Sequence, residues 1–125
     1  MARPAIVTSK PIPLPEHELL AKVFRTLGDP SRLRMLELLV EKGEMTQSQL
    51  IAHVGVMQSR ASEHLSCLVW CGFVESQRSG RSVRYRVVDD RAIEFLRLAR
   101  EFLGDNATAL GSCSVLGKEP PGPSS

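Results

Sequence analysis

The sequence predicts one mainly α-helical domain that carries a single β-hairpin, and three observations support this fold class. The first is size, because 125 residues of which 42% are apolar can build one hydrophobic core but not two. The second is a series of apolar positions with a helical period, in runs that end at glycines. The third is a change to a period of two within residues 73–88, which is typical of an amphipathic hairpin.

Four helices are predicted before the hairpin. Their approximate ranges are 16–27, 29–42, 46–54 and 59–71. Thr46 is expected to cap the third helix, with Gln49 in the reciprocal capping-box position. A further helix follows the hairpin, beginning at Asp89 or Asp90 and ending at Gly104. The predicted order is therefore α-α-α-α-β-β-α.

Both ends of the chain are rich in proline, before residue 16 and after residue 119. Segments of this composition bury too little apolar surface to fold alone. We therefore expect a flexible N-terminal arm (1–15), a folded domain (16–104) and a flexible C-terminal tail (105–125). No apolar run approaches the ~18 residues of a membrane span, and the arm does not resemble a signal peptide. These features favour a cytoplasmic protein whose three cysteines stay reduced.

The third and fourth helices, joined by the short turn 55–57 and followed by a basic hairpin, have the order of a winged helix-turn-helix. In that fold the second helix of the motif enters the major groove by its N-terminal residues, so we expect double-stranded operator DNA as a partner. The predicted DNA-contacting side chains are polar or basic: Gln58, Ser59, Arg60, Ser62, His64, Arg78, Arg81 and Arg84.

Charge is distributed unevenly along the chain. The formal net charge of +2 would not by itself indicate nucleic-acid binding. The hairpin stretch 73–88, however, holds Arg78, Arg81, Arg84 and Arg86 against Glu75 alone. Taken alone, such a hairpin could be a solvated edge strand. Its place behind a helix-turn-helix favours a contact with DNA.

The last helix carries a wider apolar sector than one core face needs, which indicates a partner chain. A second copy of this chain fits, because the two reading helices of a C2 dimer match an inverted repeat. The residues expected in this homodimer interface are Phe24, Phe95, Leu96, Ala99 and Phe102.

Cys67 and Cys71 lie one turn apart at the end of the fourth helix, off its predicted core face. Side chains at i and i+4 are ~6 Å apart at Cβ, so two such sulfurs can bind one metal ion. Cys113 lies in a segment of small residues without a core pattern, where packing gives no reason for a cysteine. No cysteine is predicted beside a paired base at a strand-to-helix turn, so the pattern does not indicate an enzyme.

Two stretches carry a resemblance to a known family. LGDPSRLRMLELL (27–39) and QSRASEHLSCLVWCGFV (58–74) resemble the second helix and the recognition helix of the ArsR/SmtB family of winged-helix metal-sensing repressors. Paired recognition-helix cysteines with a distal tail cysteine resemble the cadmium- and lead-sensing type of that family, in which the tail thiol comes from the other protomer. The resemblance implies Cys67, Cys71 and Cys113 as ligands.

The chain lacks the other metal sites of the family: a Cys-x-Cys pair in the third helix, histidines in the last helix and a cysteine in the arm. Three thiolates alone favour Hg(II) or Pb(II), whereas the resemblance favours Cd(II) or Pb(II). Whether Cys113 acts in cis or in trans stays open, as does a fourth donor such as His64 or water.

The resulting hypothesis is a homodimeric transcriptional repressor that a thiophilic metal releases from its operator, which derepresses metal-resistance genes. The alternative is a thiol redox-sensing winged-helix repressor that forms disulfides between the same cysteines. A winged-helix repressor with incidental cysteines is a further possibility.

Overall fold

The computed structural model describes residues 15–113, so most of the predicted N-terminal arm and the end of the predicted tail lie outside the described residues. The elements are α2 (Glu16–Leu27), α3 (Pro30–Lys42), β1 (Met45–Thr46), α4 (Gln47–Val54), α5 (Gln58–Trp70), β2 (Glu75–Ser79), β3 (Ser82–Arg86) and α6 (Asp90–Gly111). The predicted winged helix-turn-helix order is confirmed, with α4 and α5 as the helix-turn-helix and β2–β3 as the wing. We call α5 the reading helix.

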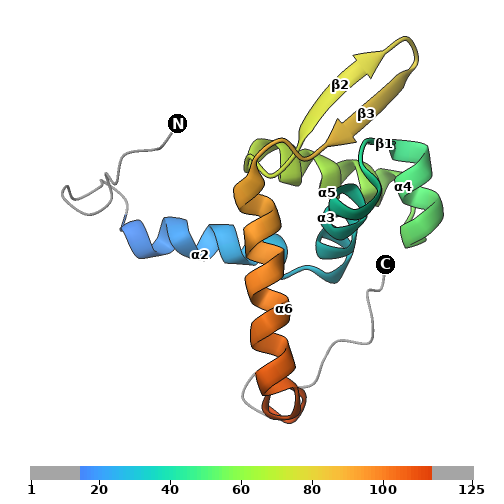
Figure 1. The fold of residues 1–125 in the computed structure, drawn as a ribbon. Coiled ribbons are helices and arrows are strands. Elements are labelled where there is room, and N and C mark those ends of the chain that lie inside the picture. The colour runs from blue at the N-terminus through green and yellow to red at the C-terminus, as the bar shows by residue number, and fades with distance from the viewer. Residues whose placement is uncertain (1–14, 114–125) are drawn as a thin grey trace.

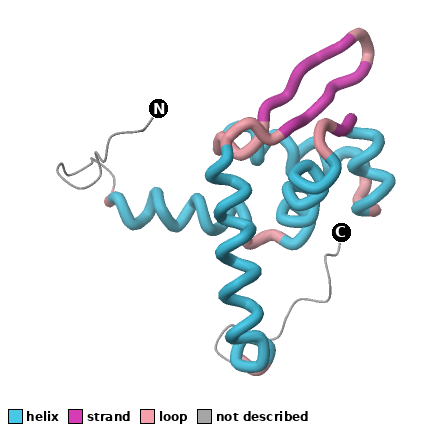
Figure 2. The backbone as a smooth tube through the Cα atoms, viewed as in Figure 1, coloured by secondary structure: helices cyan, strands magenta, loops and turns pink. Residues whose placement is uncertain are grey.

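The elements form two groups in space (Figure 1). The helices α3, α4 and α5 gather beneath the hairpin, while α2 and the long α6 cross on the other side of the molecule. The C-terminal half of α6 extends beyond the other elements, and the hairpin projects from the opposite end (Figure 2). Among residues 15–113, no helix is both long enough and apolar enough to cross a membrane.

Local signals fix the ends of the helices. Asp29 accepts a hydrogen bond from the backbone N–H of Arg32 and caps α3, whose first residue is Pro30. The capping box predicted for Thr46 and Gln49 is present at the start of α4. Both motifs satisfy backbone N–H groups that a helix leaves unpaired at its N-terminus.

The sheet is small and antiparallel, with strand order β1-β3-β2. The strand β1, which was not predicted from the sequence, pairs Met45 with Tyr85 and Thr46 with Arg84. A strand of two residues carries no periodicity, so only its tertiary pairing with the wing defines it. Gly80 turns the hairpin at φ 65°, a conformation that glycine adopts without strain.

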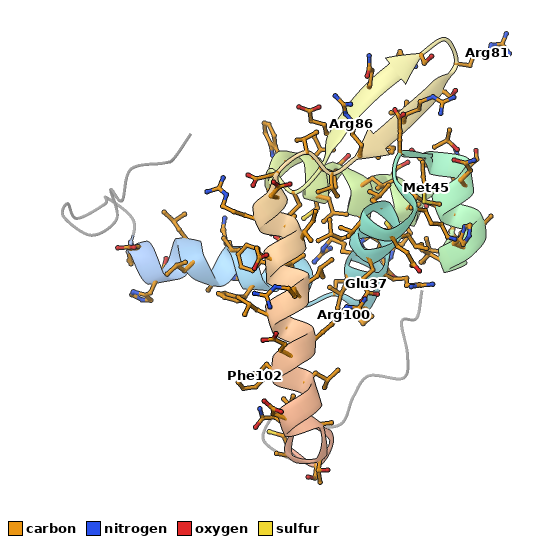
Figure 3. The ribbon with its side chains drawn as sticks, viewed as in Figure 1. Glu37, Met45, Arg81, Arg86, Arg100 and Phe102 are labelled. Carbon is orange, nitrogen blue, oxygen red and sulfur yellow. The ribbon has the colours of Figure 1, made fainter. Side chains whose placement is uncertain are left out.

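The core lies between α3, α4 and α5. Its fully buried large side chains are Met35, Leu36, Leu38, Leu50, Leu65 and Leu68. Ala92 and Leu96 of α6 join this core, one helical turn apart. Leu96 was predicted in the dimer interface, but it is 7% exposed and packs inside its own protomer. An ion pair of 2.7 Å between Arg100 and Glu37 also attaches α6 to α3 (Figure 3).

The helix α6 continues past Gly104, where the sequence predicted its end, and stops at Gly111. Asn106 has non-helical angles (φ −126°, ψ 16°), so the helix is kinked there. A glycine within a helix costs only about 1 kcal/mol, and the following alanines and leucine are strong helix formers. The first part of the predicted tail is therefore helical up to two residues before Cys113.

Candidate DNA-binding surface and thiol positions

The first turn of the reading helix presents polar side chains to solvent. Ala61, Leu65 and Leu68 are buried on one face of α5, so the positions before and between them face outward. Gln58, Ser59, Arg60 and Ser62 are all exposed. These side chains supply the donors and acceptors that the edges of bases and phosphates require.

The wing brings its basic side chains to the same region. Arg78 and Arg81 line a concave surface together with Gln58 and Ser62 of α5. Arg81 lies at the far tip of the hairpin and points away from the protein (Figure 3). We call this concave surface the wing recess. It combines polar groups on the reading helix with positive charge on the wing, an arrangement that suits a nucleic-acid backbone.

The helix α4 also contributes to the wing recess, which was not predicted from the sequence. Gln47 and Ser48 line it from the first turn of α4. The amide Nε2 of Gln47 donates to Ser62 Oγ over 2.9 Å, and its Oε1 accepts from the Tyr85 hydroxyl over 3.4 Å. Gln47 therefore joins α4, the reading helix and the wing. The sequence signal that could have indicated this contribution is the pair of polar residues directly after the Thr46 cap.

Strand register separates the arginines of the wing onto two faces. Arg78 pairs with Val83, and Arg84 pairs with Gln77. Because directly paired residues point to the same side of a sheet and neighbours alternate, Arg78 lies on the side of Val83 while Arg84 lies on the opposite side. Arg86, on the side of Arg84, forms an ion pair of 3.4 Å with Glu75. The structure thus brings Arg78 to the reading helix and turns Arg84 away from it.

His64 was predicted to contact DNA, but its side chain faces the interior and the residue is 7% exposed. Its Nδ1 accepts from Arg32 Nη1 over 3.2 Å, because a guanidinium can only donate. Its Nε2 lies 3.7 Å from Asp29 Oδ2. Burial lowers the pKa of His64 below its ordinary value; Asp29 opposes the shift and Arg32 adds to it. A neutral imidazole inside the protein does not fit a contact with a DNA groove.

Cys67 lies within α5 and Cys71 is the capping residue that follows it, and the two face different surroundings. Cys67 is half-buried and lines a hollow with Trp70 and Tyr85. Cys71 is exposed and lies at the end of α5, in a second hollow with Val23 and Phe95. Trp70 between them is 90% exposed. Both thiols can therefore be reached from solvent at the C-terminal end of the reading helix.

Cys113 follows the last residue of α6, Gly111, by two positions. This end of α6 lies at the opposite end of the molecule from the hairpin (Figure 1). All three cysteines are free thiols. Within residues 15–113 no three histidine, cysteine or acidic side chains gather closely enough to hold a metal ion. A single copy of the chain therefore carries the three predicted ligands without bringing them together.

The aromatic residues predicted for the dimer interface lie on α2 and α6. Phe24 and Phe102 are 63% and 61% exposed, and Ala99 is also exposed. The Phe24 and Phe95 rings meet edge to face, with centroids 6.3 Å apart. Phe102 projects from the C-terminal half of α6 (Figure 3). Large apolar side chains with this exposure are typical of a protein interface.

Together, the fold and the wing recess define a winged helix-turn-helix protein of the DNA-binding class. Residues 29–76 match the model of the arsR family of bacterial regulatory proteins. A probable mercury resistance operon repressor of Streptomyces lividans is 42% identical over 103 residues, which cover 82% of each chain. The chain belongs to the ArsR family; it is a transcriptional regulator and not an enzyme.

Other relatives agree with this family. The regulator CmtR of Mycobacterium tuberculosis is 46% identical over 70 residues, which cover 56% of this chain and 58% of CmtR. The crystal structure of Rv0081 from the same organism superposes with a TM-score of 0.71 at 32% identity, over 78% of this chain and 98% of Rv0081. A homodimeric winged helix-turn-helix domain of Mycobacterium bovis has a TM-score of 0.63 at 23% identity, over 85% of this chain and 89% of that domain, and so shares the fold.

Proposed function

We propose that this chain is a homodimeric repressor that binds an inverted-repeat operator and is released by a thiophilic heavy metal, Hg(II), Pb(II) or Cd(II). Release would derepress metal-resistance genes. The observation that carries the proposal is the position of two accessible thiols, Cys67 and Cys71, at one end of the helix whose other end presents Gln58 and Ser59. A ligand bound at these thiols acts directly on the element that would read DNA.

The DNA-binding half of the proposal is supported by the wing recess. Gln58, Ser59, Arg60 and Ser62 would contact base edges or phosphates from the reading helix, while Arg78 and Arg81 would contact phosphates from the wing. Arg84, on the other face of the wing, would reach only a neighbouring stretch of backbone. Gln47 would orient Ser62 through their 2.9 Å hydrogen bond.

The exposed aromatic side chains support the homodimer. A monomer would leave Phe24 and Phe102 largely in water. A second copy packed on α2 and α6 would cover both, together with Ala99 and the outer part of Phe95. The same packing would set the distance between the two reading helices and hence the spacing of the operator half-sites.

The chemistry of the thiols fits a soft metal ion. Thiolate sulfur selects soft, thiophilic ions, and Hg(II) and Pb(II) accept three thiolates without a further donor. Within one chain, Cys67 and Cys71 lie near the end of α5, whereas Cys113 follows the C-terminal end of α6. A complete set of three would therefore be closed by Cys113 of the partner subunit. The similarity to a mercury resistance repressor makes Hg(II) the first ion to test.

The test is a metal titration of the purified, fully reduced chain with an operator duplex selected in vitro. We expect a sulfur-to-metal charge-transfer band in the ultraviolet and release of the duplex at the same metal concentration. Retention of the duplex by the metal-loaded protein would contradict the proposal. Release by an oxidant but not by metal would favour the redox-sensing alternative.

A further inference from the structure

Thr26, in the last turn of α2, is linked to the reading helix in two ways: directly through Cys71, and indirectly through Arg32. The Sγ atom of Cys71, at the end of α5, lies 3.3 Å from Thr26 Oγ1. The backbone carbonyl of Thr26 accepts from Arg32 Nε over 2.8 Å. The same guanidinium donates to His64 in the middle of α5 over 3.2 Å. One residue of α2 therefore connects with the middle and with the end of the reading helix.

The direction of the Cys71–Thr26 hydrogen bond follows from the count of hydrogens. Thr26 Oγ1 donates its hydrogen to the carbonyl of Lys22 over 2.9 Å. A hydroxyl carries only one hydrogen, so the thiol S–H of Cys71 must be the donor and Thr26 Oγ1 the acceptor. Thr26 is buried, with 5% of its surface exposed. Water therefore cannot readily replace a lost partner at this hydroxyl.

We propose that this thiol-to-hydroxyl hydrogen bond holds the end of the reading helix on α2 in the DNA-binding form, and that Thr26 is the positioning residue that senses its loss. The inference rests on the proposed function, in which Cys71 releases its proton to solvent as its sulfur bonds a thiophilic ion. Sulfur without its proton cannot donate, and the Thr26 hydrogen is already used on Lys22. The ligated protein therefore lacks the contact that the free protein has.

This contact lies between the reading helix, which would bind DNA, and the helix α2, which would take part in the dimer interface. Thr26 is followed within α2 only by Leu27, and Phe24 two positions before it belongs to the proposed dimer face. Loosening α5 from Thr26 would let the reading helix shift against the helix that fixes the dimer. A ligand changes DNA affinity only through contacts that differ between the two states, and this hydrogen bond is such a difference.

The first experiment needs no metal. Operator affinity of the reduced full chain is measured with chelator for Thr26→Val, Cys71→Ala and the double variant. Each single change should weaken binding by about 3- to 10-fold, the range of one neutral hydrogen bond. The operator affinity of the double variant should be no lower than that of whichever single variant binds the operator less tightly. Additive losses would overturn the proposal.

Two conservative variants provide matched controls in case Thr26→Val destabilises the fold. Thr26→Ser keeps the hydroxyl, and Cys71→Ser keeps an O–H donor, so both should bind the operator within about 2-fold of the wild type. Thermal unfolding of each variant checks the fold independently of DNA. If Cys71→Ser binds as weakly as Cys71→Ala while both stay folded, the hydrogen bond is not what holds the helix.

The second experiment separates this inference from the proposed function. With Hg(II) added, Thr26→Val should keep the charge-transfer band, while the ratio of metal-free to metal-loaded operator affinity shrinks by about 3- to 10-fold. An unchanged ratio would overturn the inference. A wild type that does not respond to metal would refute the proposed function, while the metal-free comparison above would still decide whether the Cys71–Thr26 bond holds the helix.

Discussion

At the scale of single residues, His64 is a polar side chain of the reading helix that is buried and stabilises the fold. Arg32 donates to its Nδ1, so the neutral ring carries its hydrogen on Nε2, which lies on the side of Asp29. The same guanidinium also donates to the carbonyls of Arg25 and Thr26. Protonating His64 would place a second cation against Arg32 and remove the acceptor that Arg32 uses.

The lowered pKa of His64 predicts a pH dependence of stability. The unfolded chain binds this proton below about pH 6.5, whereas the folded chain resists it until a lower pH. The stabilisation by the neutral ring is therefore complete above pH 6.5 and decreases as the pH falls from 6.5 toward the folded pKa. Besides Asp29 and Arg32, the charges acting on the ring are Arg60 and Glu63.

Urea unfolding between pH 7.5 and 5.5 checks this expectation. The wild type should lose more stability over this range than His64→Gln, which has no proton to gain at this position. Equal slopes for His64→Gln and the wild type would show that the ring is not held neutral.

At the scale of elements, the reading helix and the wing should make separable contributions to DNA binding. Arg78→Ala or Arg81→Ala should weaken binding to operator and random DNA alike, and should reduce the slope of log affinity against log salt by about 0.9. Gln58→Ala should cost about 1–3 kcal/mol on the operator with little loss on random DNA. Salt titrations with both duplexes measure each quantity. If the helix and wing variants behave alike, the assignment of roles is incorrect.

The helix α6 is expected to hold the dimer. Phe102→Asp would bury a charge in an apolar interface, at a cost of several kcal/mol, and sedimentation should then show monomers with operator affinity collapsed. Phe102 is 61% exposed in one protomer, so this change should leave the isolated fold intact. Phe102→Leu keeps the position apolar and should stay dimeric. A dimeric Phe102→Asp protein would place the interface elsewhere.

At the scale of the whole molecule, the three thiols raise the question of which chain completes the site. Cys67→Ser, Cys71→Ser and Cys113→Ser should each still bind the operator, but each should fail to release it at metal concentrations that free the wild type. A ~100-fold loss of DNA affinity corresponds to ~2.7 kcal/mol of coupling. Release assays with Hg(II) on the reduced proteins test this. A normal response of Cys113→Ser would reduce the site to Cys67 and Cys71.

Mixed dimers distinguish a site within one chain from a site between two chains. When Cys67→Ser and Cys113→Ser subunits are combined, a site closed by Cys113 of the partner subunit leaves one intact set of three cysteines per mixed dimer. The charge-transfer band should then return to about half of its wild-type amplitude in the mixed dimers. A band that stays absent in the mixture would show that Cys113 acts within its own chain.

Local sequence patterns were enough to predict the order of the helices and the hairpin, and most of their limits. Caps such as Asp29 and Thr46, and glycines such as Gly43, act over a few residues, so their effect can be predicted without the rest of the fold. The exposure of Gln58 and Ser59 followed in the same way, because the apolar period of α5 assigns its core face. The end of α6 was missed, since a single glycine weakens a helix without stopping it.

The neighbours of each polar side chain could not be predicted from local patterns, because they depend on how distant segments pack. His64 and Leu96 lie inside because α3 and the core cover them. Gln47 enters the wing recess because α4 packs beside the hairpin, and Arg84 leaves it because of strand register. The contact of Cys71 with Thr26 joins residues 45 positions apart. A local pattern gives the face on which a side chain lies, but the packing of distant segments determines what covers that face.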